Sequence, residues 1–395
     1  MTLRSAIMPF PARLRTELKI DTVLLGIVGA LLLGGFVILT SASISISDNV
    51  AGNPFFYIQR QLVAAAIGAL AGGVCLFIPM QVWQKLGPLM LLMGLVLLAV
   101  VLVPGVGYEV NGATRWVRVG FMNLQVAEPA RLCFLMYLAG YLVRRHKDVR
   151  EQFVGFLRPM LVLTLACILL LKQPDFGAAI VLLATAMTML FVAGARIRDF
   201  IVFFLLGVVA VAALTILEPY RMKRLTGFMD PWSDPFDSGF QLTQSLIAIG
   251  RGEWFGVGLG DSVQKLFYLP EAHTDFVFAV FAEEFGLLGS LVLIGLFLAL
   301  LWRIFQLGIR AHNAERLFEA YLAIGLGTWL GLQAFINVGV NMGLLPTKGL
   351  TLPLISYGRS SLIITMICIG LLLRVHHELA VDAKPVNRKR GRKKK

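Results

Sequence analysis

Charged residues are scarce in this chain. Only 15% of its 395 residues are Asp, Glu, Lys or Arg, whereas 57% are hydrophobic, and the mean hydropathy is +0.78. A soluble domain typically carries about 25% charged residues. The shortage of charge therefore excludes a soluble globular domain and indicates a protein that crosses a membrane several times.

Cysteines are few in this chain, and repeats of the kind found in transporters are absent. The four cysteines all lie within apolar segments, so no disulfide framework is predicted; they are Cys75, Cys133, Cys167 and Cys368. The five histidines and the scattered acidic residues do not have the spacing of a zinc site. We find neither a repeat of about 20–50 residues nor an inverted duplication of the halves, which are features typical of repeat proteins and transporters.

Long apolar segments, in contrast, are abundant. Ten of them approach or exceed the length that crosses a bilayer core of about 30 Å. They predict an all-α polytopic membrane protein with ten transmembrane helices and no separate soluble domain. The predicted spans are residues 21–43, 61–80, 85–104, 128–143, 157–171, 177–194, 199–217, 275–302, 317–343 and 353–373.

The distribution of Lys and Arg predicts the orientation of these spans. With the N-terminus in the cytoplasm, about two thirds of the 36 Lys and Arg residues fall in cytoplasmic segments, and residues 144–150 are the strongest signal. Both termini are therefore expected inside, as an N-terminal arm of residues 1–20 and a basic tail of residues 375–395. The membrane domain between them comprises residues 21–374. Its first span is long for a signal peptide, and we interpret it as retained.

The basic tail ends in Arg-Lys-Arg-Gly-Arg-Lys-Lys-Lys over residues 388–395. A run of this kind beside a membrane is expected to meet anionic lipid headgroups or a cytoplasmic partner, and not nucleic acid.

The longest loop, residues 218–274, lies between spans 7 and 8 and is expected to face the periplasm. Loops of this length in compact proteins are usually functional. Residues 241–249 predict an amphipathic helix lying at the membrane interface. The glycine-rich residues 250–260 predict a flexible connector, because they lack the Lys-Ser/Thr pair and the preceding strand of a nucleotide-binding loop.

A carboxylate stands where this loop meets span 8. Asp275 could act as a general base on a substrate anchored in lipid, or it could be a helix-start carboxylate stabilised by the helix dipole. His273 and Lys265 lie just upstream, and Glu283 and Glu284 form a second acidic pair within the span. Acidic groups at this depth are functional candidates because burying them in a bilayer is costly.

Two further motifs lie at the outer ends of spans, one at the start of span 4 and one between spans 5 and 6. Glu128 and Arg131 lie three residues apart at the start of span 4, and they form either a local ion pair or a site in which Arg131 pairs with an acid of span 8. The first choice for that partner is Asp275. Asp175 follows Pro174 between spans 5 and 6, where it either caps the next helix or contributes to a site.

The last two motifs supply cations. Arg115 and Arg118 lie on the outside against the topology bias, which suggests an anionic ligand. Residues 337–361 contain Lys348 and Ser356 in a stretch broken by Gly and Pro, and irregular backbone at this depth is tolerated only against protein or a water-filled cavity. All five motifs are therefore predicted to surround one cavity.

Together these motifs resemble the SEDS family of shape, elongation, division and sporulation proteins, over nearly the whole chain. Asn337-Val-Gly, Gly343-Leu-Leu-Pro, Gly349-Leu-Thr-Leu-Pro and Ser356-Tyr-Gly look like the family signature. Residues 239–245 and 269–276 look most like the cell-division branch of Gram-negative bacteria. The resemblance implies a ten-span inner-membrane peptidoglycan glycosyltransferase. It would polymerise lipid II at the division septum with a class B penicillin-binding transpeptidase (FtsI) and other divisome membrane proteins.

The chemistry of that reaction suits these residues. The acceptor 4-hydroxyl loses its proton as it attacks the anomeric carbon, and the leaving pyrophosphate needs cations, so one base and several cations suffice. Asp275 falls on the family's proposed catalytic aspartate and is the predicted base. The predicted substrate-binding residues are Arg115, Arg118, Glu128, Arg131, Asp175, Lys265, His273, Lys348 and Ser356. No metal ligands are predicted, and a Mg²⁺ or Mn²⁺ ion bridging the pyrophosphate is left open.

Three positions depart from the family pattern. Arg131 replaces the usual Lys, Asp261 replaces a common Asn, and Arg359 replaces a Gly. The long Arg359 side chain either enters the cavity or extends outward, and we predict the outward position.

Other functions remain open at this point. A lipid II flippase could use Glu283 and Glu284 along a headgroup path, although a flippase needs access from both faces and the polar motifs lie on one. A non-catalytic scaffold for division proteins would suit the basic tail. Within the family, the elongation branch is the alternative to cell division.

Overall fold

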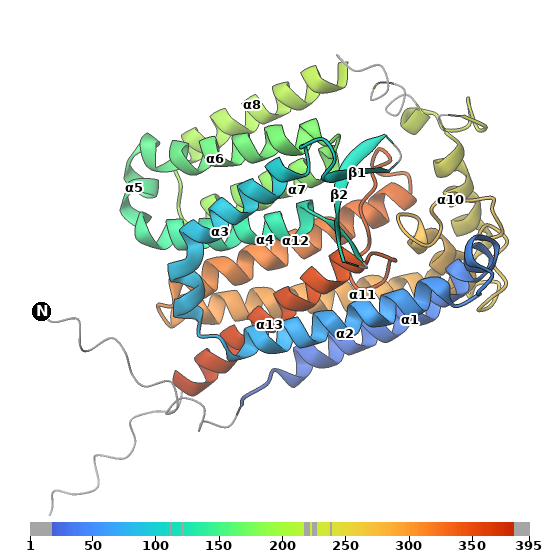
Figure 1. Ribbon diagram of the computed structural model, residues 1–395, viewed down its shortest axis with the longest axis horizontal. Coiled ribbons are helices and arrows are strands. Elements are labelled where there is room, and N and C mark those ends of the chain that lie inside the picture. The colour runs from blue at the N-terminus through green and yellow to red at the C-terminus, as the bar shows by residue number, and fades with distance from the viewer. Residues whose placement is uncertain are drawn as a thin grey trace, which may run out of the picture.

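The computed structural model describes residues 18–110, 112–120, 122–216, 222, 227–237 and 239–382. Every predicted span overlaps a helix in this part of the chain, and the long helices lie side by side (Figure 1). These helices are α1 (Thr22–Ala51), α2 (Phe56–Phe77), α3 (Met80–Val100), α4 (Ala127–Arg144), α6 (Phe153–Lys172), α7 (Phe176–Val192), α8 (Ile197–Ile216), α11 (Val277–Asn313), α12 (Leu317–Asn341) and α13 (Arg359–Asp382). Seven of them are long and apolar enough to cross a membrane.

Close helix packing depends on small residues at the contacts. Helix α2 lies against α13, where a Cβ added at Gly72 would come within 2.5 Å of the Met366 carbonyl oxygen. A Cβ added at Gly370 would lie 2.2 Å from the Gly72 carbonyl oxygen. Glycine at both positions therefore lets the two backbones approach, as is common between membrane helices.

The chain ends that the structure describes are tied together at one end of the bundle. Asp21 caps α1 and accepts two hydrogen bonds from Arg303 of α11, at 2.8 and 3.0 Å. His376 of α13 lies 3.4 Å from the same carboxylate. Both described ends thus lie on one side, as an even number of spans requires. Residues 388–395, on which the tail prediction rests, lie outside the described residues.

The all-α prediction is wrong between α3 and α4. This segment forms an antiparallel sheet of β1 (Gly107–Val110), β2 (Ala113–Val119) and β3 (Met122–Gln125), in that order. The turns contain Gly112 (φ 73°) and Gly120 (φ 57°), a region of backbone space that glycine adopts readily. Ser360 of α13 accepts a hydrogen bond of 3.0 Å from the Gln125 amide, which fixes the sheet over the start of that helix.

The predicted amphipathic helix is present as α10 (Phe240–Arg251). Its buried residues include Leu242, Thr243, Ser245 and Ala248, and it packs against α11 and α12. The Ser245 hydroxyl donates a 2.8 Å hydrogen bond to the Asn341 carbonyl of α12. One face of α10 is therefore docked on the helix bundle.

Residues 250–260 do not form the flexible connector that their glycines predicted. Helix α11 is interrupted at Gly286 (φ 65°, ψ −164°), and residues 252–258 pack against the interruption. We call residues 252–258, together with the interrupted turn of α11 at Gly286, the glycine clamp. The amides of Val257 and Gly258 donate to the Glu283 and Glu284 carbonyls, at 2.9 and 3.2 Å. In return the amides of Leu287 and Leu288 donate to carbonyls of residues 253 and 254, at 2.9 and 3.1 Å. The loop thus satisfies backbone groups that the broken helix exposes.

Candidate functional site

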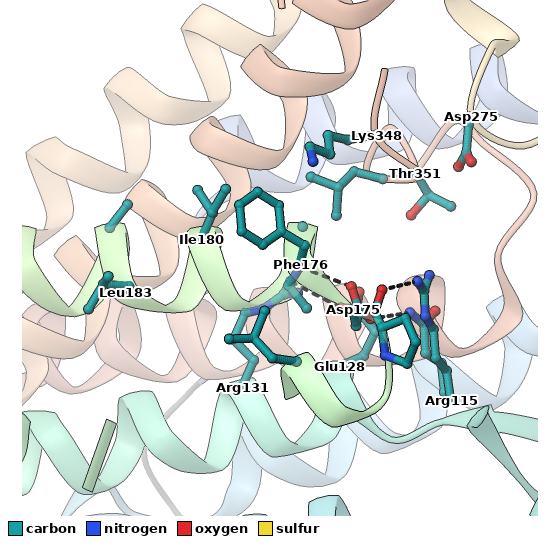
Figure 2. A pocket seen from close by; sticks show the side chains of 18 of the residues that line it. Arg115, Glu128, Arg131, Asp175, Phe176, Ile180, Leu183, Asp275, Lys348 and Thr351 are labelled. Atoms are coloured by element: carbon teal, nitrogen blue, oxygen red, sulfur yellow. Dashed lines mark hydrogen bonds and ion pairs between the residues drawn. The ribbon is translucent and has the colours of Figure 1, made fainter. Parts of the chain in front are cut away.

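A cavity of about 1920 Å³ opens at the end of the bundle that carries the sheet and α10. The structure brings all five polar motifs to its wall. Six of the predicted site residues line it, namely Arg115, Glu128, Arg131, Asp175, Asp275 and Lys348. Figure 2 shows Asp275 and Lys348 on one side of the cavity, with Glu128, Arg131 and Arg115 on the other.

Asp275 is positioned through its backbone. Its carbonyl accepts hydrogen bonds from the side-chain amides of Asn337 and Asn341, at 2.8 and 3.0 Å. Asn341 also accepts a 3.1 Å bond from the Ala279 amide, so α12 fixes the first turn of α11. Phe276, and not Asp275, is the N-cap of α11. The Asp275 side chain is half-buried and lines the cavity.

A glycine allows the loop before α13 to approach this carboxylate. A Cβ added at Gly349 would lie 2.9 Å from Asp275 Oδ2, which is closer than a methyl group tolerates. Lys348 lies next to it in the chain, and its ammonium is 4.1 Å from the centre of the Phe176 ring. The site thus places a carboxylate and a cation on adjacent segments of the cavity wall (Figure 2).

The predicted pairing of Arg131 with an acid of span 8 is wrong. Its Nη1 lies 3.7 Å from Glu128 Oε2 on the same helix, and Glu128 is the only carboxylate within 4.0 Å of it among the described residues. Its guanidinium also lies 4.9 Å from the Trp329 ring of α12. The helical spacing of three residues supplies a partner locally, so none is needed from α11.

The Glu128–Arg131 pair forms a polar patch within the cavity wall. Both side chains are at most 5% exposed, yet Glu128 Oε2 and the Nε and Nη1 of Arg131 make no protein hydrogen bond. Buried polar groups normally find partners. Both residues line the cavity, but each of these atoms exposes less than 1 Å² of surface, so the unsatisfied groups lie within the cavity wall.

We expect Glu128→Gln to destabilise the protein, because it leaves the buried Arg131 charge without a counter-ion. Breaking a buried ion pair typically costs about 3–5 kcal/mol. Thermal unfolding in detergent should show a lower Tm for Glu128→Gln than for the double variant Glu128→Gln/Arg131→Met, in which neither charge remains. Equal Tm values for wild type and Glu128→Gln would contradict this assignment.

Asp175 and Arg115 organise the turn between α6 and α7. Asp175 Oδ1 accepts a 3.1 Å hydrogen bond from the Ala178 amide, which is the predicted helix cap. Arg115 of β2 donates to the Gln173 carbonyl at 3.2 Å and also to the Pro174 carbonyl. The sheet that the sequence did not predict therefore holds one rim of the cavity in place.

Four predicted site residues do not line this cavity. The buried Lys265 ammonium is 2.8 Å from Glu284 Oε1 and 2.8 Å from the Ser41 hydroxyl of α1. The Ser356 hydroxyl accepts a 2.8 Å bond from the Leu352 amide within its own turn. Both side chains are thus engaged in the fold, and we do not carry them forward as substrate contacts.

His273 and Arg118 lie near the cavity without lining it. The His273 ring packs between Tyr57 and Tyr357, with ring centres 4.6 and 5.8 Å away, and burial lowers the pKa of this histidine while Glu271 raises it. Arg118 lines a smaller neighbouring pocket.

The structure also shows where two of the residues that depart from the family pattern lie. Arg359 lines the main cavity, so the predicted outward position is wrong. Asp261 is exposed in the loop after the glycine clamp and does not line the cavity.

Both members of the acidic pair of α11 have partners in the fold. Glu283 accepts hydrogen bonds from Arg251, the Ser262 hydroxyl and the Val263 amide, at 3.1, 2.5 and 3.1 Å. Glu284 is held by Lys265 and by Ser41, whose hydroxyl donates at 2.6 Å. Both carboxylates are buried and fix the long loop to α11 and α1. They do not line the cavity, which removes the feature that favoured a headgroup path.

Sequence reasoning missed the apolar half of the cavity and a buried glutamine that anchors the loop before α13. The cavity extends between α7 and α8, where it is lined by Leu183, Met187, Phe191, Phe200, Phe203 and Phe204. Gln61 of α2 donates to the Ser356 carbonyl at 3.1 Å and accepts from the Gly358 amide at 3.3 Å. A glutamine inside an apolar span was the available signal for this anchor.

The described residues contain no group of three or more His, Cys, Asp or Glu side chains arranged to hold a metal ion. Glu128, Asp175 and Asp275 line the cavity as separate carboxylates.

Comparison with known proteins places this chain in a defined group. Residues 21–381 match the family model FTSW_RODA_SPOVE, described as "Cell cycle protein". A "Probable peptidoglycan glycosyltransferase FtsW" of Thioalkalivibrio sulfidiphilus is 56% identical over 376 residues, which cover 95% of this chain and 93% of that protein. The protein of the same description from Alkalilimnicola ehrlichii is 57% identical, with 90% and 89% covered.

Solved structures agree with these relatives. One, described as "Structural coordination of polymerization and crosslinking by a peptidoglycan synthase complex", has a TM-score of 0.74 and 33% identity, and the match covers 92% of this chain and 99% of that chain. The rod shape determining protein RodA of Thermus thermophilus has a TM-score of 0.66 and 33% identity, with 91% and 98% covered.

Proposed function

Because the chain belongs to the FtsW/RodA/SpoVE family, also called SEDS, we propose that it is a peptidoglycan glycosyltransferase that polymerises lipid II during septal wall synthesis. The family membership is supported by relatives with more than half of their residues identical over most of the chain. The reaction, the substrate and the septal location are the proposal.

The two-part character of the cavity carries this proposal. One part is polar and holds Asp275, Lys348, Arg115 and the Glu128–Arg131 pair, whereas the other is an apolar groove between α7 and α8. A lipid-linked sugar has the same division, with a charged, hydroxyl-rich head and a hydrocarbon tail. Its tail would lie in the groove within the bilayer while its head reaches the polar part.

Asp275 would serve as the general base. It takes the proton of the acceptor 4-hydroxyl as that oxygen bonds to the anomeric carbon of the donor, and the bond from this carbon to the pyrophosphate oxygen breaks. General base catalysis contributes about 10²–10⁴-fold in rate. The leaving pyrophosphate is negatively charged, so it needs cations rather than a proton donor. Lys348 and Arg115 are cations of the cavity wall.

A divalent cation is compatible with this arrangement. Mg²⁺ is usually bound through one or two carboxylates together with substrate phosphates and water, so separate cavity carboxylates suffice. Asp175 would be the protein ligand, and the ion would neutralise pyrophosphate charge.

The location and the partner follow from the same family. We propose that the protein lies in the bacterial inner membrane with both termini in the cytoplasm and the cavity facing the periplasm, at the division septum. A class B transpeptidase such as FtsI would crosslink the strands that it makes. One similar structure is described as a complex that coordinates polymerisation and crosslinking.

Reconstitution with fluorescent lipid II tests this function. The protein, together with its class B transpeptidase, is expected to produce glycan ladders on gels. Headgroup translocation without ladders would instead favour a flippase, and neither activity would favour a scaffold. Localisation at the side wall in place of the septum would assign the protein to the elongation branch.

A further inference from the structure

A second, smaller pocket of about 290 Å³ adjoins the main cavity. It is lined by three arginines and two small residues, namely Arg60 of α2, Arg118 of β2, Arg359 at the start of α13, Gly120 and Asn123. We call it the arginine pocket. Arg359 and Asn123 also line the main cavity, so the two spaces are contiguous.

The arginine pocket has an uncompensated positive charge. Neither Arg60, Arg118 nor Arg359 lies within 4.0 Å of a carboxylate of the described residues. Arginines elsewhere in the bundle, such as Arg131 and Arg303, have acidic partners. Like charges that share a small space repel one another, and an anion that binds between them removes that repulsion.

Aromatic rings contact two of these guanidinium groups. Arg60 Cζ lies 3.9 Å from the centre of the Phe56 ring, and Arg118 Cζ lies 5.5 Å from the centre of the Tyr108 ring. A cation–π contact orients a guanidinium group without neutralising it. Arg60 and Arg118 are exposed to solvent, where such a contact is weak, so it restrains these donors only weakly before a ligand arrives.

We propose that the arginine pocket binds a carboxylate of the peptide stem carried by the lipid-linked substrate, an inference that rests on the proposed function. The pyrophosphate must lie beside the reacting carbon, near Asp275 and Lys348, and neither residue lines this pocket. A substrate in the main cavity reaches the arginine pocket past Arg359 and Asn123 with a part remote from the reacting bond. The stem supplies carboxylates there, and guanidinium groups bind carboxylates with two parallel hydrogen bonds.

A chain with glycine in place of Arg359 would lack one of these three cations. This chain would consequently select an acidic stem more strongly than a relative with glycine. Arg359 would be a specificity residue, because it separates the reacting part of the cavity from the arginine pocket.

The test compares two substrates with two proteins. The substrates are lipid II with free stem carboxylates and lipid II with every stem carboxylate amidated, and the proteins are wild type and Arg60→Gln/Arg118→Gln/Arg359→Gly, each in complex with the transpeptidase. For wild type, amidation should raise KM about tenfold or more while kcat changes less than about twofold, as expected for lost charged hydrogen bonds remote from the reaction. The triple variant should have the raised KM with both substrates.

Other outcomes would overturn the inference in distinguishable ways. If the triple variant raises KM while wild type does not discriminate the two substrates, the pocket binds phosphate and the stem assignment fails. If neither change affects KM, the pocket binds no part of the substrate. Glycan ladders from wild type show that the proposed function holds in either case. Lys172→Gln, which removes an exposed cation at the α6 end near the cavity, is the matched control and should leave both KM values unchanged.

Discussion

Asp275→Asn should reduce glycan polymerisation by at least about 100-fold, which is the lower range for loss of a general base. An amide is isosteric with the carboxylate but cannot take the proton of the acceptor hydroxyl. The substitution leaves the backbone contacts of residue 275 in place, because Asn337 and Asn341 donate to its carbonyl. The measurement is the rate of ladder formation from fluorescent lipid II, with Tm in detergent to confirm an unchanged fold.

Asp261→Asn is the matched control for this variant. It makes the same chemical change in the same loop, at an exposed residue that does not line the cavity. Its rate should equal that of wild type. A near-normal rate for Asp275→Asn would refute the assignment of the base, and an equal loss in both variants would show a general effect of charge on the loop.

The sequence predicts the helices and also predicts that the site residues gather at one face of the membrane, because both depend on local sequence. A span is defined by the length of an apolar run, and the turns between spans must place their polar residues at one face or the other. Asp275, Asp175 and Lys348 were assigned to the same face on this basis, and the structure brings them to one cavity.

The sheet and the ion pairs could not be predicted in the same way. Residues 113–119, Ala-Thr-Arg-Trp-Val-Arg-Val, alternate too briefly to stand out beside apolar runs about 20 residues long. Lys265 is predicted as a substrate contact because local sequence does not reveal its partners. These are remote in the chain, since Glu284 is 19 residues away and Ser41 is 224 residues away. The error at Arg131 is the reverse. The prediction places its partner on span 8, whereas its partner Glu128 lies three residues away on the same helix.

The glycine content of residues 250–260 predicts a flexible connector, and the glycine clamp shows why this prediction is wrong. Glycines indicate flexibility when nothing surrounds them, but Gly252 and Gly256 lie where any Cβ would collide with α11. An added Cβ would be 2.0 Å from the Ala282 carbonyl oxygen in the first case and 2.1 Å from that of Glu284 in the second. Their role is close approach and not motion, and the sequence does not distinguish the two.

Gly286→Ala should therefore be the most damaging single-methyl change in α11. The backbone at this position (φ 65°, ψ −164°) is a conformation that essentially only glycine adopts, and an added Cβ would lie 2.3 Å from the Gly256 amide nitrogen. Backbone strain of this kind costs about 1–3 kcal/mol, and the collision adds about as much again. We expect a large fall in Tm and in the yield of folded protein.

Gly295→Ala, nine residues further along the same helix, separates this effect from a general intolerance of α11 to alanine. Gly295 has no atom within 4 Å of its added Cβ, so the change should be neutral or stabilising by about 0.5–1 kcal/mol. If Gly286→Ala folds, it should still polymerise poorly, because the clamp fixes the short helical segment between the break and Asp275. A Gly286→Ala protein with the Tm and the rate of Gly295→Ala would show that the interruption of α11 does not require glycine.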